Sequence, residues 1–268
     1  MEATCGRGTP SRRTSRSSPV KSIPEGATGK CFGFVQTYDA KPKRRLFELL
    51  KSQGMQHNQQ VVFLSDGGDD VRDFQLYLNP EAEHYLDWFH VTMRLTVMGQ
   101  YAKGLPAEIP TAAAEDDDPG PPLRRDEIDA LLERIKHYLW HGNVVRALEE
   151  IEDLELDLDN LDALPEPGKK LARAANEFHT YIRLNAPFIP NYGERWRTQE
   201  AIASGFVESA VNQMISKRMV KKQQMQWTKR GAHLLVQMRA QVLNNDLDHT
   251  FRGWYPGFRP NEGAQQAA

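Results

Sequence analysis

A short apolar run that ends on an acidic turn constrains this fold more than any other feature. Residues 61–64, VVFL, are followed at once by Ser65-Asp66-Gly67-Gly68. Four consecutive apolar residues closing on Asp-Gly are typical of a central strand in an α/β sheet. Open α/β sheets form their sites at the carboxyl ends of such strands. The sequence therefore predicts a site at Asp66, although an Asp-Gly turn often follows a strand without any function.

The segments on either side of this strand extend the α/β pattern. KCFGFVQTYD at 30–39 predicts a buried strand, and Pro42 suits the first turn of a helix that follows it. Residues 84–86 predict one more short strand, and apolar spacing predicts a helix at 88–103.

The second half of the chain predicts helices only. A break rich in Pro, Ala and Asp at 106–122 is followed by apolar residues at helical spacing through 124–184. Further helices are expected from Thr198 to about Lys221 and from Lys229 to Asn244. The predicted architecture is an α/β core interrupted by an all-α insertion.

Charge is divided unevenly along the chain, although the net charge is only −2. Residues 1–45 hold ten Lys and Arg against three Asp and Glu, and residues 167–245 hold thirteen against four. Residues 108–166 hold five Lys and Arg against eighteen Asp and Glu. Basic segments of this kind indicate contact with nucleic acid, with solvated helix faces as the alternative.

Composition also limits the cellular setting. Cys5 and Cys31 are too few for a disulfide framework or a cysteine zinc site, so a reducing cytosolic setting fits best. No stretch of about 18 apolar residues is present, and no membrane partner is expected.

Glu208 is a second candidate for chemistry. Ser204 and Gly205 on its predicted helix are small and leave room for a metal ion and a phosphate beside the carboxylate. A glutamate facing solvent is the alternative, because most helical glutamates are exposed.

Asp87 and His90 lie three residues apart where a helix is predicted to begin. Asp87 is expected to cap that helix, and His90 to contact a phosphate. His84 adds a third possible metal ligand, but His-x₂-Asp-x₂-His does not have the spacing of a common zinc site.

A basic run follows Glu208 and is interleaved with Met225 and Trp227. It predicts a patch that binds DNA phosphates with strong salt dependence, or alternatively a solvated helix end. Its members are Lys217, Arg218, Lys221, Lys222, Lys229 and Arg230.

Three long segments together resemble one known family. They are KCFGFVQTYDAKPKRRLFELLKSQGMQ at 30–56, VVFLSDGGDDVRDF…EHYLDWFHVTMRLTVMGQ at 61–100 and NYGERWRTQEAIASGFVESAVNQMISKRMVKKQQMQWTKRGAHLLVQMRAQVLN at 191–244. They are similar to bacterial insertion-sequence transposases of the ISKra group, which are relatives of the Mutator-like transposases. The resemblance covers roughly residues 21–255.

This resemblance implies an RNase-H-like fold whose Asp-Asp-Glu triad holds two Mg²⁺ ions for DNA cleavage and strand transfer. The family's middle Asp corresponds to Asp66 and its Glu to Glu208. Its short Asp-x-x-His motif corresponds to Asp87 and His90, which would help to position DNA. The implied partners are transposon ends, target DNA, and further copies of this chain or full-length transposase. The implied location is the bacterial cytoplasm, at the nucleoid.

The resemblance leaves the family's first Asp without a counterpart ahead of residue 30. Taking Asp66 and Asp87 as the first two aspartates fails, because a separation of 21 positions is too short for the two additional strands that the fold needs. An amino-terminally truncated RNase-H-like core that lacks its first strands and does not catalyse strand transfer is therefore expected.

The expected domains follow from this comparison. They are a disordered, non-native leader at 1–20, a partial core at 21–105, a helical insertion at 106–197, the catalytic-Glu and C-terminal helices at 198–255, and a disordered tail at 256–268. Two other functions stay open. One is a non-catalytic module that binds DNA or inhibits full-length transposase, and the other is a protein-interaction module centred on the acidic helices.

Overall fold

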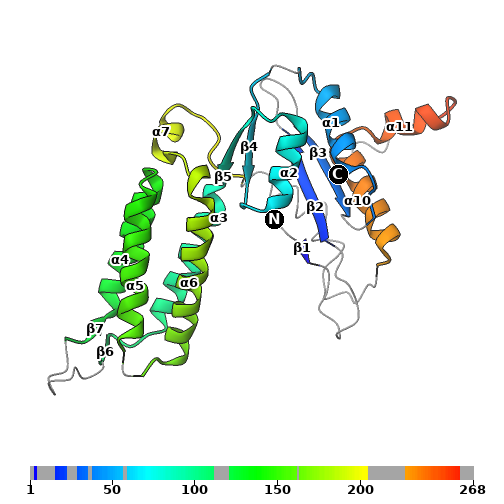
Figure 1. The fold of residues 1–268 in the computed structure, drawn as a ribbon. Coiled ribbons are helices and arrows are strands. Elements are labelled where there is room, and N and C mark those ends of the chain that lie inside the picture. Colours follow the sequence, from blue (N-terminus) through cyan, green and yellow to red (C-terminus); the bar gives the residue numbers. More distant parts are fainter. Residues whose placement is uncertain are drawn as a thin grey trace. The chain divides into compact units, whose positions relative to one another are not determined.

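The structure, a computed structural model, describes residues 3–4, 16–22, 29–35, 38–56, 59–111, 121–161, 163–204 and 227–259. The chain divides into two compact units, whose elements are labelled in Figure 1. The terminal unit comprises Met1–Gln59, Tyr77–Asn79 and Gly205–Ala268, and the central unit comprises Gln60–Leu76 and Pro80–Ser204. The fold class is mixed α/β, as the sequence predicts.

An antiparallel sheet and three helices make up the described part of the terminal unit. The elements are β1 (Ala3–Thr4), β2 (Arg16–Ser22), β3 (Lys30–Val35), α1 (Pro42–Ser52), α10 (Lys229–Leu243) and α11 (Leu247–Trp254). β2 pairs with β3 from Ser17↔Val35 to Ser22↔Lys30. All of β3 after Lys30 is buried, in agreement with its apolar sequence.

Side chains of α10 and of its C-cap residue, Asn244, cover the edge of β3 that faces away from β2. Asn244 accepts a hydrogen bond from the Cys31 N–H at 2.6 Å and donates one to the Cys31 carbonyl at 2.9 Å. Gln237 donates a hydrogen bond to the Gly33 carbonyl. An edge strand otherwise presents unpaired backbone groups, so these two amides take the place of a neighbouring strand.

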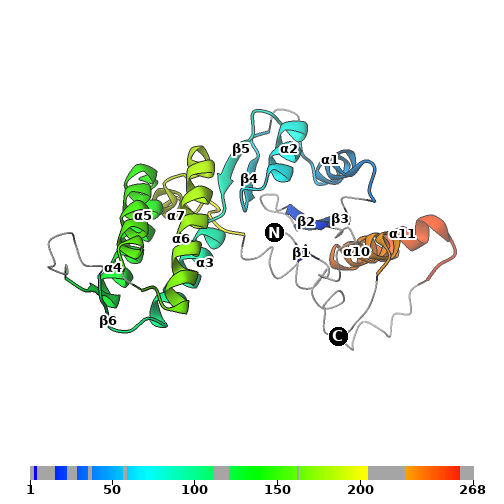
Figure 2. The ribbon, with the colours of Figure 1, turned by 60° about the horizontal axis from the view of Figure 1, so that its bottom comes forward.

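The central unit combines two parallel strands with a four-helix bundle. Its elements are β4 (Val62–Ser65), most of α2 (Asp69–Leu78), β5 (Glu83–Leu86), α3 (Trp88–Lys103), β6 (Glu108–Ile109), β7 (Leu123–Arg124), α4 (Arg125–Trp140), α5 (Val144–Asp159), α6 (Glu166–Asn185), the 3-10 turn η1 (Ala186–Phe188) and α7 (Tyr192–Arg197). Helices α3 and α5 each pack against both α4 and α6, which closes the bundle (Figure 2). Fully buried Ile135, Leu158 and Leu171 belong to its apolar interior.

Two expectations about the ends of the chain are corrected by these elements. The sequence predicts disorder at 1–20, but residues 16–20 belong to β2. That strand has no apolar alternation to reveal it, and its hydrogen bonds to β3 define it. The sequence also predicts a helix from Thr198, but α7 ends at Arg197 and residues 201–204 are not helical.

The compact units also differ from the expected domains. The partial core at 21–105 contains β3 and α1 of the terminal unit together with β4, β5 and α3 of the central unit. Helix α3 shares one apolar core with α4, α5 and α6, so the bundle begins before the expected insertion at 106–197. No helix in the described ranges has the length and apolar character needed to cross a bilayer.

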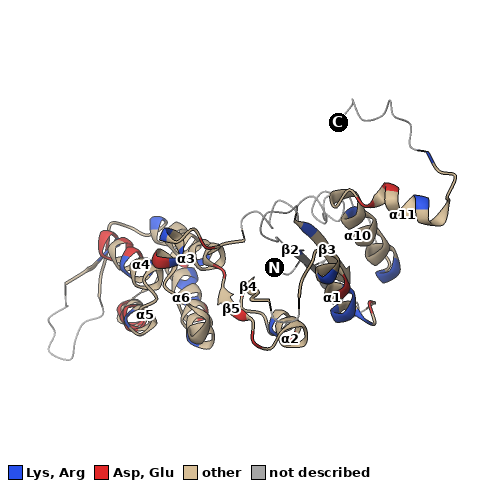
Figure 3. Cartoon of the chain, turned by 90° about the horizontal axis from the view of Figure 1, so that it is seen from above, with Lys and Arg blue, Asp and Glu red and all other residues tan. Residues whose placement is uncertain are grey.

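Acidic side chains gather on one part of the bundle. Asp and Glu are concentrated on α4 and α5 in Figure 3. Burial raises the pKa of Asp157, and the neighbouring carboxylates of Asp153 and Glu127 raise it further. Such a face repels a polyanion.

Candidate functional site

Asp66 and Asp87 leave the same edge of a parallel strand pair. β4 and β5 are parallel, and Ser65 at the end of β4 is opposite Leu86 at the end of β5. The Asp87 N–H donates a hydrogen bond of 2.8 Å to the Ser65 carbonyl. The prediction that Asp66 follows the carboxyl end of a strand is confirmed. The parallel pairing adds Asp87 to the same edge.

A tight turn shapes the backbone around Asp66. The Gly68 N–H donates to Asp66 Oδ1 at 3.1 Å, and the Gly67 N–H donates to Ser65 Oγ at 3.1 Å. Gly67 has φ of 89°, and a Cβ atom there would lie 2.5 Å from Asn185 Oδ1 on α6. Glycine is therefore required at this position by both its backbone conformation and its contact.

His84 lies under this turn as a buried, neutral imidazole. Its Nε2 is 2.7 Å from Ser65 Oγ, and its Nδ1 has no hydrogen-bond partner among the described residues. Burial, together with the charge of Arg72, lowers the pKa of His84 to about 4. The described residues contain no group of three His, Cys, Asp or Glu placed to hold a metal ion.

Asp87 is completely buried, and both of its carboxylate oxygens are used within the protein. Oδ1 accepts from the Phe89 N–H at 2.9 Å, which confirms the expected cap of α3, and from the Ser204 N–H at 3.1 Å. Oδ2 accepts from the Ser204 hydroxyl and lies 3.7 Å from His90 Nε2. Asp87 therefore has no surface for DNA, and any effect on DNA would act through the groups it holds.

The Ser204 contact fixes the end of the central unit on the strand edge. The Trp88 N–H also donates to the Ile202 carbonyl at 3.0 Å, so residues 202–204 are bonded to the first turn of α3. Their backbone bonds explain why a helix does not begin at Thr198. Glu208 is four residues further along the chain and lies outside the described residues.

Two arginines from other helices, Arg72 on α2 and Arg94 on α3, contact side chains of α6. The Arg94 guanidinium carbon is 4.2 Å from the centre of the Tyr181 ring. Arg72 Nη2 lies 3.5 Å from Asn185 Oδ1, one helical turn from Tyr181, and its guanidinium is 3.8 Å from the centre of the Phe188 ring. Asn185 is also the residue that contacts Gly67. Neither arginine could be identified from the sequence, because the local sequence of a helix does not distinguish a functional arginine from one that faces solvent.

The Tyr181 hydroxyl lies within electrostatic range of Arg94, Asp66 and Asp87. It is buried and has no hydrogen-bond partner among the described residues. Burial raises the pKa of this phenol far above its ordinary value. Arg94 lowers that pKa, and Asp66 and Asp87 raise it. The strand edge thus brings two carboxylates, an arginine and a protonated phenol within electrostatic range of one another.

The expected basic patch falls largely outside the described residues. Lys217, Arg218, Lys221 and Lys222 all lie there, as Glu208 does. Lys229 and Arg230 are described, and both are exposed in the first turn of α10 in the terminal unit.

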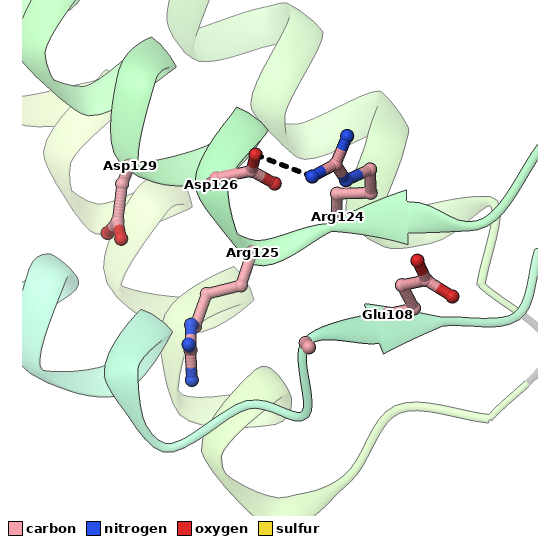
Figure 4. Close-up of a pocket in the computed structure, with 6 residues that line it drawn as sticks. Glu108, Arg124, Arg125, Asp126 and Asp129 are labelled. Atoms are coloured by element: carbon pink, nitrogen blue, oxygen red, sulfur yellow. Dashed lines mark hydrogen bonds and ion pairs between the residues drawn. The ribbon is translucent and has the colours of Figure 1, made fainter.

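A separate hollow lies at the β6–β7 hairpin, at a distance along the chain from the strand edge. It has a volume of about 270 Å³ and is lined by Ala107, Glu108, Arg124, Arg125, Asp126 and Asp129. Figure 4 shows its carboxylates and guanidinium groups around the hairpin, with Arg124 paired to Asp126 at 2.9 Å. Its lining holds three carboxylates and two guanidinium groups.

Comparisons with family models, curated proteins and solved structures find no match to this chain. The function has to be argued from the strand edge itself.

Proposed function

We propose that the chain is a DDE-type transposase unit with an RNase-H-like core, related to the ISKra group. The observation that carries the proposal is the parallel β4–β5 pair, whose carboxyl ends deliver Asp66 and Asp87 to one edge. A helical bundle placed between this edge and the predicted Glu helix also matches the order of elements that the resemblance implies. In an intact relative, this core would cleave DNA and transfer strands in an Mg²⁺-dependent reaction.

The candidate carboxylates differ in whether they are available to bind a metal ion. Asp87 is unsuitable as a ligand, because its oxygens already accept hydrogen bonds from Phe89 and Ser204. Asp66 is half-buried on a glycine turn, and its carboxylate is the type of ligand that Mg²⁺ prefers. The proposal therefore needs Glu208 as the second ligand, four residues beyond the bonded Ser204.

Bound Mg²⁺ would supply activation of the attacking oxygen and stabilisation of the leaving oxygen. By the resemblance, Asp66 and Glu208 would hold the metal. Asp87 holds residues 202–204 near the strand edge. The resemblance identifies only two of the three carboxylates. We therefore expect metal binding by the chain alone, without strand transfer.

Calorimetric titration with Mn²⁺ and Mg²⁺ tests this assignment. The chain is compared with Asp66→Asn and Glu208→Gln, and with Glu177→Gln on the exposed face of α6 as a control. Loss of binding in both site variants and its retention in the control is the expected result. Binding that is unchanged by Asp66→Asn would overturn the proposal.

A non-catalytic DNA-binding module, which would inhibit a complete transposase by joining its oligomer, is the second candidate. It is favoured by the carboxylate of Asp87, whose oxygens are already used within the protein. Its mark is DNA binding that neither Asp66→Asn nor chelation of divalent ions alters. Both candidates have DNA as the partner, and the bacterial nucleoid as the proposed location.

A further inference from the structure

Arg72 and Arg94 are held by flat side chains rather than by acids. Arg72 stacks on the Phe188 ring at 3.8 Å, and Arg94 stacks on the Tyr181 ring at 4.2 Å. A guanidinium stacked in this way keeps the N–H groups along its edge directed outward. The two supporting rings are Tyr181, on α6, and Phe188, in η1, which follows α6 directly. These contacts hold both cationic groups against the central unit.

Neither arginine has a carboxylate partner within the described part of the chain. Arg195 makes a useful contrast, because it stacks on Tyr85 at 4.2 Å and also pairs with Glu200 at 2.7 Å. Arg72 is partly buried, and its Nε has no hydrogen-bond partner among the described residues. A partly buried charge without a counter-ion is costly. Such a pair of charges is accounted for by an anion that binds between them.

The position of this pair identifies the anion. Asn185 contacts both Arg72 and the Gly67 position that follows Asp66, so the guanidinium groups flank the carboxylate edge. We propose that Arg72 and Arg94 bind phosphates of one DNA strand and hold the backbone beside Asp66. The identity of the anion as DNA rests on the proposed function. Planar guanidinium groups suit this role because they bind phosphate oxygens in a bidentate manner.

This site differs in kind from the basic run at 217–230. Apart from Lys229 and Arg230, which are exposed on α10, the run lies outside the described residues. Arg72 and Arg94 are instead pre-positioned by packing, so they lose less side-chain freedom on binding. They set where the strand lies, and the run contributes general attraction.

The test is a fluorescence-anisotropy titration of a labelled DNA duplex with the full chain in EDTA, over a series of salt concentrations. The variants are Arg72→Gln and Arg94→Gln, with Arg183→Gln on the exposed face of the same helix as the control. Each site variant is expected to weaken binding roughly fivefold, as expected for one lost charge-assisted contact. The slope of log K against log salt should fall by about 1 for each arginine. The control should change neither quantity.

Lysine variants guard against misfolding. Arg72→Lys and Arg94→Lys keep the charge, and they should restore the salt slope of the native chain with only part of its affinity. Site variants that bind DNA as the control does, or lysine variants that restore no slope, would overturn the inference. Because EDTA removes divalent ions, failure of the metal proposal leaves this result intact. If the chain binds metal but neither arginine variant changes the DNA affinity, this inference is rejected and the metal proposal is not.

Discussion

Arg45 of the terminal unit and Arg72 of the central unit show opposite treatments of the same side chain. Arg45 pairs with Asp39 at 2.9 Å and donates to Gln237 Oε1, so its charge is compensated inside the unit. Arg72 stacks on Phe188 and contacts a neutral amide, with no carboxylate partner in the described chain. The ion pair of Arg45 stabilises the fold, whereas we propose that the charge of Arg72 is compensated by a bound anion. This difference separates the structural polar groups of the terminal unit from the strand edge of the central unit.

Replacement of Asp87 should have the largest effect on stability, because its buried carboxylate accepts hydrogen bonds from Phe89 and Ser204. Asp87→Ala leaves the N–H groups of Phe89 and Ser204 without their acceptor and should lower the free energy of unfolding by about 2–4 kcal/mol. Urea denaturation followed by circular dichroism measures this loss. Asp126→Ala, exposed near the start of α4, is the control and should change stability by less than about 0.5 kcal/mol. An Asp87 variant as stable as the control would break the distinction.

Acid should act next most strongly, through His84. Its pKa is lowered from 6.5 to about 4 in the folded chain, so the unfolded chain binds more protons between these values. The free energy of unfolding should therefore fall as the pH falls from 6.5 towards 4, by roughly 3 kcal/mol at most. His84→Gln, compared with the native chain in urea at each pH, should remove this part of the dependence. An identical pH dependence in both proteins would show that His84 is not buried in neutral form.

The strands and helices that the sequence predicted correctly have local signals. The apolar run before Asp66, the strand ending near Leu86 and the helix at 88–103 all follow from spacing within a few residues. The contact between Asp87 and Ser204 joins positions 117 apart, and no local pattern marks it. β2 was missed for the same reason, since only its pairing with β3 defines it. The RNase-H-like core and the transposase chemistry stay predictions from resemblance.

Substitution of Arg45 and of Arg72 tests the comparison between the two units directly. Arg45→Gln removes the partner of Asp39 and should lower the free energy of unfolding by about 1–3 kcal/mol. Arg72→Gln should change it by less than about 0.5 kcal/mol or raise it, because a binding group is commonly retained at a cost in stability. Urea denaturation of both variants measures the contrast. Equal losses would mean that Arg72 is structural as well.

The smallest expected effect sharpens the position of Arg72. Gly54 and Gly67 both have positive φ, but a Cβ at Gly54 would meet nothing within 4 Å, whereas one at Gly67 would meet Asn185. Substitution by Ala should cost about 1 kcal/mol at Gly54 from backbone strain, and about 1 kcal/mol more at Gly67 from the contact. Only Gly67→Ala should also weaken DNA binding, because Asn185 holds Arg72. If Gly54→Ala and Gly67→Ala have the same stability in urea and the same DNA affinity, the Gly67 turn does not position Arg72.

Localised cleavage by bound Fe²⁺ tests the central claim, that the β4–β5 edge is a metal site of a DNA-handling core. Fe²⁺ replaces Mg²⁺, and hydroxyl radicals formed from peroxide and ascorbate cut the backbone close to the ion. Mass spectrometry of the fragments should show cuts at Asp66–Gly68 and around Glu208, and these cuts should disappear in Asp66→Asn. Cuts that persist in Asp66→Asn, or that fall on the acidic face of α4 and α5, would contradict the account.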